Sequence, residues 1–383
     1  MDFNVLSIRI ASATVYRGVF DAPVVSQLCR YVELHAAGAQ EKELAAAAAA
    51  VFSAALHFNR SADVCSAVIS AAETDENPVS RALAFGEELS PQERTAALFD
   101  LETLTAAAHI SPAKGELPAG APVWTSEDSG VLEDAAACFD YLKGYYAKNG
   151  YGIASRYSAF KYDGKLIPAV NTDSIRLSSF KNYDAERAVV RENTEAFVRG
   201  LPAQNVLLYG DRGTGKSATI HALLNEYGQM GLRMIEIAKK NLSGLPRLIE
   251  LLSQYPNRFI IYIDDLSLTG DEAVLSDLKA VLEGSLEKRP DNILVYATSN
   301  RRHLVKEKAS VQLSQETSDA DAREEMLSLS DRFGLTVTFF NPNLKVYHEI
   351  VAFLAKENSL DFDEQRLFAA ADRFAIRRGG RSP

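Results

Sequence analysis

The pattern of hydrophobic and polar positions changes character near residue 205. Residues from about 23 to 109 form successive helical patterns separated by short polar breaks. Beyond residue 205, short apolar runs rich in Val, Ile, Tyr and Phe follow one another, and helical patterns lie between the first four: NVLLY, RMIEI, FIIYI, ILVYAT and LTVTFF. This alternation is typical of a parallel sheet covered by helices on both faces.

The helical part has clear local signals. The segment EKELAAAAAAVFSAALHF consists of strong helix formers. Ser90 and Glu93 have the spacing of a capping box ahead of an apolar pattern, which predicts a helix start. A proline- and glycine-bearing stretch at 111–130 predicts a loop or linker, and residues 131–148 predict another helix.

A hairpin and a terminal pair of helices frame the apolar runs. In AFKYDGKLIPAV, Asp163 and Gly164 separate two β-prone segments, which predicts a hairpin. Two helical patterns follow Asn343. We therefore expect four regions: a helical N-terminal adaptor or assembly region (1–150), a linker with a hairpin and a helix (151–200), an α/β core (201–342) and a partial helical lid (343–383).

Composition narrows the class of protein. A length of 383 residues favours two or three domains, and 47% hydrophobic with 24% charged residues is ordinary for a soluble globular protein. The net charge of -10 argues against a generally basic surface for nucleic acid, although a local basic groove stays open. Cys29, Cys65 and Cys138 match neither a disulfide framework nor a metal site, so we interpret them as buried thiols in a reducing compartment.

No stretch predicts export or a membrane span. The N-terminus MDFNVLSIRI lacks a positive region followed by an apolar core, and the alanine-rich run at 45–56 is too short to cross a bilayer. We expect a cytoplasmic protein without a membrane partner.

A glycine-rich motif follows the first apolar run. LLYGDRGTGKSATIHALL has the spacing G-x-x-x-x-G-K-S between a predicted strand and a predicted helix, which is the context of a P-loop. Its glycines let backbone N–H groups face phosphates at a helix N-terminus, while the lysine reaches the β- and γ-phosphates and the serine ligates Mg²⁺. The sequence predicts ATP and Mg²⁺ as cofactors, bound by Gly210, Asp211, Arg212, Gly213, Thr214, Gly215, Lys216, Ser217 and Ala218.

Two adjacent carboxylates end the run FIIYI. Asp264 is placed to hold the Mg²⁺ shell together with Ser217. Asp265 is placed to orient and deprotonate the attacking water, although most ATPases of this type have a glutamate there. The aspartate carboxylate lies about 1.5 Å further back. The alternative is that Asp265 is a turn residue or supports another ligand.

Two further polar residues end or precede a strand. Asn300 follows ILVYATS, where it can position the lytic water, but asparagine is also a common turn former. Arg332 in SLSDRFGL precedes the last strand, where its fixed fork suits transition-state phosphate. The alternative for Arg332 is a surface ion pair with Asp331, which contributes little.

Taken in order, these motifs resemble the AAA+ ATPases: Walker A at 210–217, Walker B at 259–265, a sensor-1 asparagine, an arginine-finger candidate and a helical lid. More closely, NTEAFVRGLPAQNVLLYGDRGTGKSA, YIDDLSL, LKAVLEGSLEKRPDNILVYATSNRRHL and SLSDRFGL resemble a bacterial AAA+ family, the DUF815 group. The resemblance covers about 160–383 and is most specific between 205 and 335. It implies that Asp-Asp at Walker B is a family trait, and the family name carries no cellular function.

The resemblance implies a P-loop core with strand order 5-1-4-3-2 and a homo-oligomer in which Arg332 acts in trans. Its sensor-2 arginine would be Arg377, Arg378 or Arg381, and such lids normally continue further than this one. AKKNLSGLPRL lacks the aromatic pore loop of peptide-threading motors, which disfavours that class.

We expect Mg²⁺-dependent ATP hydrolysis coupled to conformational change, acting on an unidentified protein or nucleic-acid client. Two alternatives stay open. The first is a nucleotide-operated binding switch with negligible turnover. The second is a P-loop kinase, which would need a pocket for a small acceptor and would leave Asn300 and Arg332 without a role.

Overall fold

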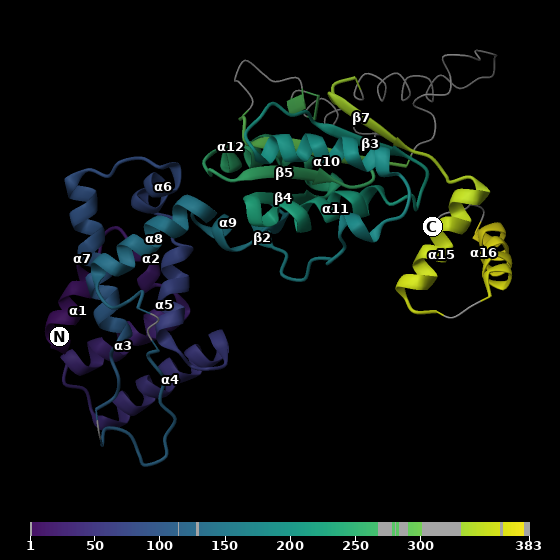
Figure 1. The fold of residues 1–383 in the computed structure, drawn as a ribbon. Coiled ribbons are helices and arrows are strands. Elements are labelled where there is room, and N and C mark those ends of the chain that lie inside the picture. The colour runs from purple at the N-terminus through teal and green to yellow at the C-terminus, as the bar shows by residue number, and fades with distance from the viewer. Residues whose placement is uncertain are drawn as a thin grey trace. The chain divides into compact units, whose positions relative to one another are not determined.

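A computed structural model of the chain divides into two compact units, Met1–Arg156 and Tyr157–Pro383 (Figure 1). The structure describes residues 2–113, 115–127, 130–266, 278–279, 281–282, 290–300, 331–360 and 363–378.

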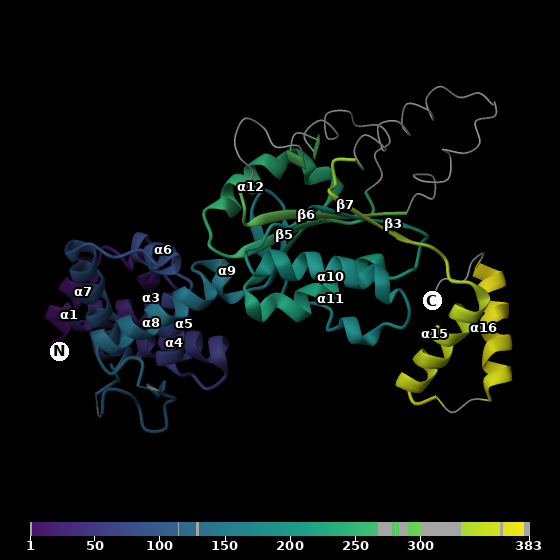
Figure 2. The same cartoon turned by 45° about the horizontal axis from the view of Figure 1, so that its top comes forward.

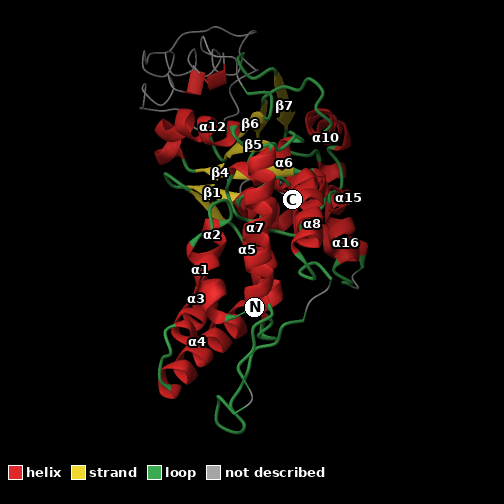
Figure 3. Cartoon of the chain, turned by 90° about the vertical axis from the view of Figure 1, so that its left-hand side faces the viewer, coloured by secondary structure: helices red, strands yellow, loops and turns green. Residues whose placement is uncertain are grey.

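The first unit is helical, as the sequence predicts, and the described strands all belong to the second unit (Figure 3). Ser90 caps α7 and forms the predicted capping box with Glu93. All three cysteines are buried, and none of them forms a disulfide. The helices are α1 (Phe3–Ala11), α2 (Arg17–Phe20), α3 (Pro23–Ala36), α4 (Glu41–Asn59), α5 (Val64–Glu73), α6 (Pro78–Phe85), α7 (Pro91–Ala108), α8 (Ala135–Asn149) and α9 (Ile153–Arg156).

The second unit alternates strands and helices. Its strands are β1 (Ala159–Tyr162), β2 (Leu166–Pro168), β3 (Val206–Gly210), β4 (Leu232–Ile237), β5 (Arg258–Ile263), β6 (Ile293–Ser299) and β7 (Leu335–Phe339). Its described helices are η1 (Leu177–Ser179), α10 (Asp184–Val198), α11 (Lys216–Tyr227), η2 (Gly228–Met230), η3 (Lys239–Gly244), α12 (Leu245–Ser253), α15 (Leu344–Glu357) and α16 (Glu364–Arg378). Both helices predicted after Asn343 are therefore present.

One sheet carries all seven of the described strands in the order β2-β1-β4-β5-β6-β3-β7. Counted from β3 along the chain, the five predicted strands lie in the order 5-1-4-3-2 when read from the β7 edge, as the resemblance implied. The predicted hairpin is β1–β2, and β1 also pairs in parallel with β4. The sheet is thus two strands wider than the predicted core.

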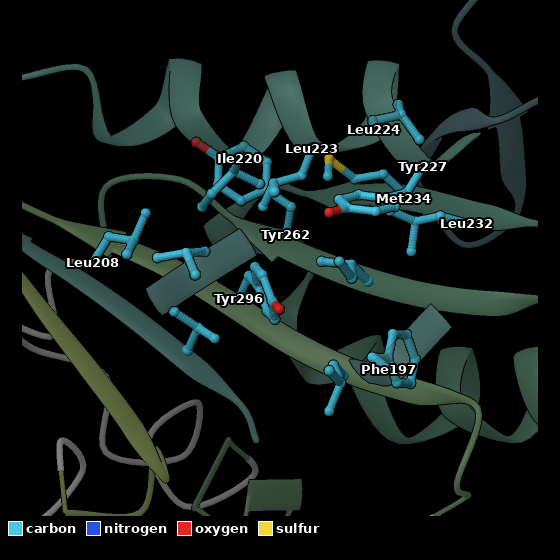
Figure 4. Packing of buried hydrophobic residues seen from close by; sticks show 14 of the residues in the cluster. Phe197, Leu208, Ile220, Leu223, Leu224, Tyr227, Leu232, Met234, Tyr262 and Tyr296 are labelled. Atoms are coloured by element: carbon cyan, nitrogen blue, oxygen red, sulfur yellow. The ribbon is translucent and has the colours of Figure 1, made fainter. Parts of the chain in front are cut away.

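Helices cover both faces of the sheet. In Figure 2, α10 and α11 lie on one face and α12 on the other. On the α10–α11 side, Phe197, Ile220 and Leu223 pack with buried strand residues such as Tyr262 and Tyr296 in one hydrophobic cluster (Figure 4). Because both faces are covered, the strands are near-continuous apolar runs. Among the described residues, no helix is long and apolar enough to cross a membrane.

Candidate functional site

The P-loop connects β3 to α11 at the carboxyl edge of the sheet. Gly210, the last residue of β3, has φ +133°, and a Cβ there would lie 2.0 Å from the backbone oxygen of Phe339 on β7. Only glycine fits this close approach. The N–H of Asp211 donates to the same oxygen at 2.9 Å, which fixes the start of the loop against β7.

The loop presents backbone donors. Gly213 and Gly215 have φ +73° and +86°, the left-handed conformation that turns successive N–H groups to one side. Within the described part of the chain, the N–H groups of Gly213, Thr214 and Gly215 donate to no acceptor. They lie at the N-terminus of α11, where the helix dipole favours negative charge. This cradle fits a phosphate.

The P-loop lysine is folded onto its own loop. Lys216 is buried, and its Nζ donates to the carbonyl oxygens of Gly210 at 3.2 Å and Asp211 at 2.6 Å. Burial lowers the pKa of Lys216 even though Asp211, Asp265 and Asp264 oppose the shift. The ammonium therefore gains from an added anion, which is the condition that a bound phosphate chain satisfies.

Three hydroxyl groups converge on one oxygen of Asp264. Ser217 Oγ donates to Asp264 Oδ1 at 2.8 Å, Tyr262 OH at 2.6 Å and Thr298 Oγ1 at 2.7 Å. Burial works against the charge, but these hydrogen bonds outweigh it and lower the pKa of Asp264. The carboxylate and the Ser217 hydroxyl are oxygen ligands of the kind that Mg²⁺ prefers.

Asp265 is held in a left-handed turn. Its φ is +49°, a conformation that aspartate tolerates better than most residues, and its N–H donates to Thr298 Oγ1 at 2.9 Å. Its Oδ1 accepts from Asn300 Nδ2 at 2.8 Å, and its Oδ2 lies 3.7 Å from Lys239 Nζ. The site therefore joins the ends of β4, β5 and β6.

The other P-loop residues serve the loop itself or face outward. Asp211 Oδ2 accepts from the N–H of Asn341, just after β7, and the buried Thr214 donates to the Asp211 carbonyl at 2.9 Å. Arg212 is exposed and Ala218 is half-buried. Asp211 thus ties the P-loop to the segment that leads into α15.

Arg332 is not brought to this site. Arg332 is half-buried and precedes β7, at the opposite end of that strand from the P-loop, so at least about 13 Å of strand separates them. Arg377 is exposed on α16. The side chain of Arg378 and the whole of Arg381 lie outside the described residues.

The sequence profile of the family described as "Protein of unknown function (DUF815)" matches residues 153–383, well over half of the chain. This chain belongs to the DUF815 family. No curated protein matches the sequence.

Among solved structures, the chain is similar to the RuvB Holliday junction branch migration motor of Thermotoga maritima, at 16% identity and a TM-score of 0.36. Two variants of that motor give 17% and 15% identity at the same TM-score. The first match covers 50% of this chain and 57% of the motor, so the chain spans less than two thirds of that structure.

In this DUF815 chain, three residues of the site were not predicted from the sequence: Tyr262, Thr298 and Lys239. Strand alternation offers a signal for two of them, because Tyr262 and Thr298 lie two residues before Asp264 and Asn300 and so face the same side of the sheet. No comparable signal exists for Lys239, which the fold brings to Asp265 from the end of another strand.

Arg187 lies behind the P-loop and was not predicted from the sequence either. Its guanidinium stacks over Phe180 at 4.3 Å and its Nε donates to Thr219 Oγ1 at 3.3 Å. A Cβ on Gly215 would lie 3.5 Å from this guanidinium. Burial lowers the pKa of Arg187 to about 10. Arg187 therefore fixes α11 and the P-loop against the segment before α10.

Proposed function

We propose that this protein hydrolyses ATP with Mg²⁺. The observation that supports this most is one hydrogen-bonded set, in which Ser217 donates to Asp264 and Asn300 donates to Asp265 beside the P-loop. Asp264 and Asp265 have different hydrogen-bond partners. This difference suits Asp264 to hold the metal ion and Asp265 to accept a proton from water.

The residues divide the work by position. The N–H groups of the P-loop and Lys216 bind the phosphates, and Ser217 with Asp264 would hold Mg²⁺. That ion, when bound, neutralises charge on the β- and γ-phosphates. Asp265 accepts the proton of the attacking water, and Asn300 fixes the orientation of its carboxylate. Replacing Asp264 by Asn should therefore weaken the Mg²⁺ dependence of turnover.

Steady-state phosphate release tests the proposal. Wild-type protein should release phosphate from Mg-ATP, whereas Asp265→Asn should bind ATP with unchanged affinity and release little. ATP binding without turnover in the wild-type protein would leave a nucleotide-operated binding switch instead. The contact between Lys239 and Asp265 favours that second candidate, because the ammonium occupies a carboxylate oxygen that would otherwise face the attacking water.

We also propose that Arg332 acts on the nucleotide of a neighbouring copy. Its place at the amino end of β7 supports this, since the P-loop of the same chain lies at the other end of the adjoining strand. An arginine supplied in trans contributes roughly 10³–10⁵ in rate. Activity should then rise with protein concentration as copies assemble.

Mixing two inactive variants tests this arrangement. Arg332→Ala keeps the base and Asp265→Asn keeps the arginine, so the mixture should regain part of the wild-type rate although each alone is inactive. If sizing shows co-assembly and no activity returns, the arginine does not act between copies.

The client is a separate proposal. We infer that the helical first unit serves as an adaptor or assembly region for a protein or nucleic-acid client in the cytoplasm. The buried cysteines, which form no disulfide, support a reducing compartment. A pull-down with ATP-loaded Asp265→Asn should enrich a client that wild-type protein releases, and enrichment equal to that by Lys216→Ala would contradict nucleotide-dependent capture.

A further inference from the structure

A cavity of about 300 Å³ lies between α11 and the widened edge of the sheet, within the second unit. Its walls come from β1, β4, β5, α11 and the segment 169–173, which follows β2. The P-loop motif does not use it. The volume is at the lower end of the range for small-molecule sites, and such sites combine an apolar lining with a few polar groups.

The inner wall of the cavity is apolar. Met234 on β4 faces Leu224 on α11, as Figure 4 shows, and Tyr262 on β5, Ala159 and Ala169 complete this wall. All five positions carry side chains without formal charge. This surface suits a hydrocarbon or aromatic group rather than a phosphate or a sugar.

The outer wall carries opposite charges at paired positions. Lys161 on β1 and Glu236 on β4 are register partners, so both side chains leave the same face of the sheet about 4.8 Å apart. Both are exposed, and within the described ranges they form no ion pair with each other or with another residue. Asp173 and the side chain of Asn225 add a carboxylate and an amide to this wall.

We propose that this cavity binds a free α-amino acid with an apolar side chain. The ligand carboxylate would pair with Lys161, its ammonium with Glu236, and its side chain would cover the wall formed by Met234 and Leu224. In an α-amino acid, the ammonium and the carboxylate are bonded to the same carbon. Their close spacing matches that of Lys161 and Glu236, which carry opposite charges on neighbouring strands. A purely anionic ligand would instead face two carboxylates, Glu236 and Asp173.

Two side chains link the cavity to the P-loop site. Tyr262 lines the cavity and also donates to Asp264 Oδ1 at 2.6 Å. His221 lines it one helical turn after Ser217, and its ring meets the Tyr262 ring edge-on at 5.4 Å. A ligand that moves either ring therefore acts on the groups that would hold Mg²⁺.

Calorimetry on the full chain tests binding without reference to nucleotide or activity. The probes are L-leucine, L-methionine and L-phenylalanine, with 4-methylpentanoate and isopentylamine as leucine analogues that lack the ammonium or the carboxylate. At least one amino acid should bind with a micromolar to millimolar dissociation constant. Both analogues should bind at least about 10-fold more weakly, because each loses a charged hydrogen bond.

Matched variants locate the site. Lys161→Met and Glu236→Gln should each weaken amino-acid binding about 10-fold. The same changes at two exposed positions outside the cavity, Lys165→Met and Glu226→Gln, should leave it unchanged. Binding of isopentylamine as tight as that of leucine, equal loss in the control variants, or no binding at millimolar concentration would each overturn the proposal.

Coupling to the nucleotide is a second measurement, and it alone rests on the proposed function. A saturating amino acid should change the affinity for Mg-ATP, and ATP should change the affinity for the amino acid by the same factor, typically about 5- to 150-fold. Tyr262→Phe should keep amino-acid binding and reduce this factor. Amino-acid binding without coupling would retain the cavity site and refute its link to Asp264.

Discussion

Replacing Asp265 by asparagine and by glutamate separates the chemistry of the carboxylate from its shape. Asparagine tolerates the left-handed conformation at φ +49° and keeps an oxygen that accepts from Asn300. It cannot accept a proton. We therefore expect Asp265→Asn to keep its fold and its ATP affinity and to lose about 10²–10⁴ in turnover.

Glutamate keeps the charge and changes the geometry. The left-handed conformation costs an ordinary L-residue about 1–2 kcal/mol, and an extra methylene moves the carboxylate past the 2.8 Å contact with Asn300. A lost hydrogen bond to a charged group costs about 1.5–3 kcal/mol. Because the Asp265 side chain is 43% exposed, water replaces part of that bond, and we expect turnover to fall about 10- to 100-fold.

Two measurements check this reasoning. Phosphate release gives the turnover of both variants. Thermal unfolding reports the cost of the left-handed backbone conformation at residue 265 and does not depend on activity. The melting temperature of Asp265→Glu should fall by about 2–8 °C, whereas Asp265→Asn should melt as the wild type does. If Asp265→Glu turns over as fast as the wild type or faster, the reach of the side chain limits the rate and the left-handed turn does not matter.

Three further changes test the P-loop and its surroundings. Lys216→Ala should weaken Mg-ATP binding in calorimetry at least about 10-fold and leave the fold intact, since loop N–H groups cannot neutralise the phosphate charge alone. Unchanged affinity would remove the P-loop from the proposed site. Thr298→Val should raise the pKa of Asp264, which its hydroxyl helps to lower. The lowered pKa stabilises the folded state at pH values above the ordinary carboxyl pKa, and this stabilisation is lost as the pH falls through the pKa of the folded state. Acid unfolding of Thr298→Val should therefore begin at a higher pH than that of the wild type. An unchanged pH of acid unfolding would contradict this. Gly210→Ala should cost about 1–3 kcal/mol in chemical unfolding, because its Cβ would meet a backbone oxygen of β7. Gly231→Ala, with φ +93° but open space around its Cβ, measures the backbone strain alone, and equal losses would show that the contact is unimportant.

Local chemistry determined much of this protein from the sequence alone. The spacing of Gly210, Gly215 and Lys216 predicted the P-loop, because few other residues allow left-handed turns and close backbone approach. The apolar runs predicted five strands, and the strand order followed once the family resemblance was added. The Asp163-Gly164 turn predicted a hairpin because its flanking segments are short and β-prone.

Only the tertiary structure decided which distant groups meet. The β1–β2 hairpin could have stood alone, but pairing of β1 with β4 satisfies an open sheet edge and creates the cavity beside α11. Thr298 has the pattern of a core residue, and only the pairing of β6 with β5 brings its hydroxyl onto Asp264. Lys239 reaches Asp265 from another strand. Side-chain hydrogen bonds act over about 3 Å, whereas a sequence pattern indicates only which face of the sheet a residue occupies. Hydrogen-bond partners on different strands can therefore be identified only when it is known which strands are neighbours.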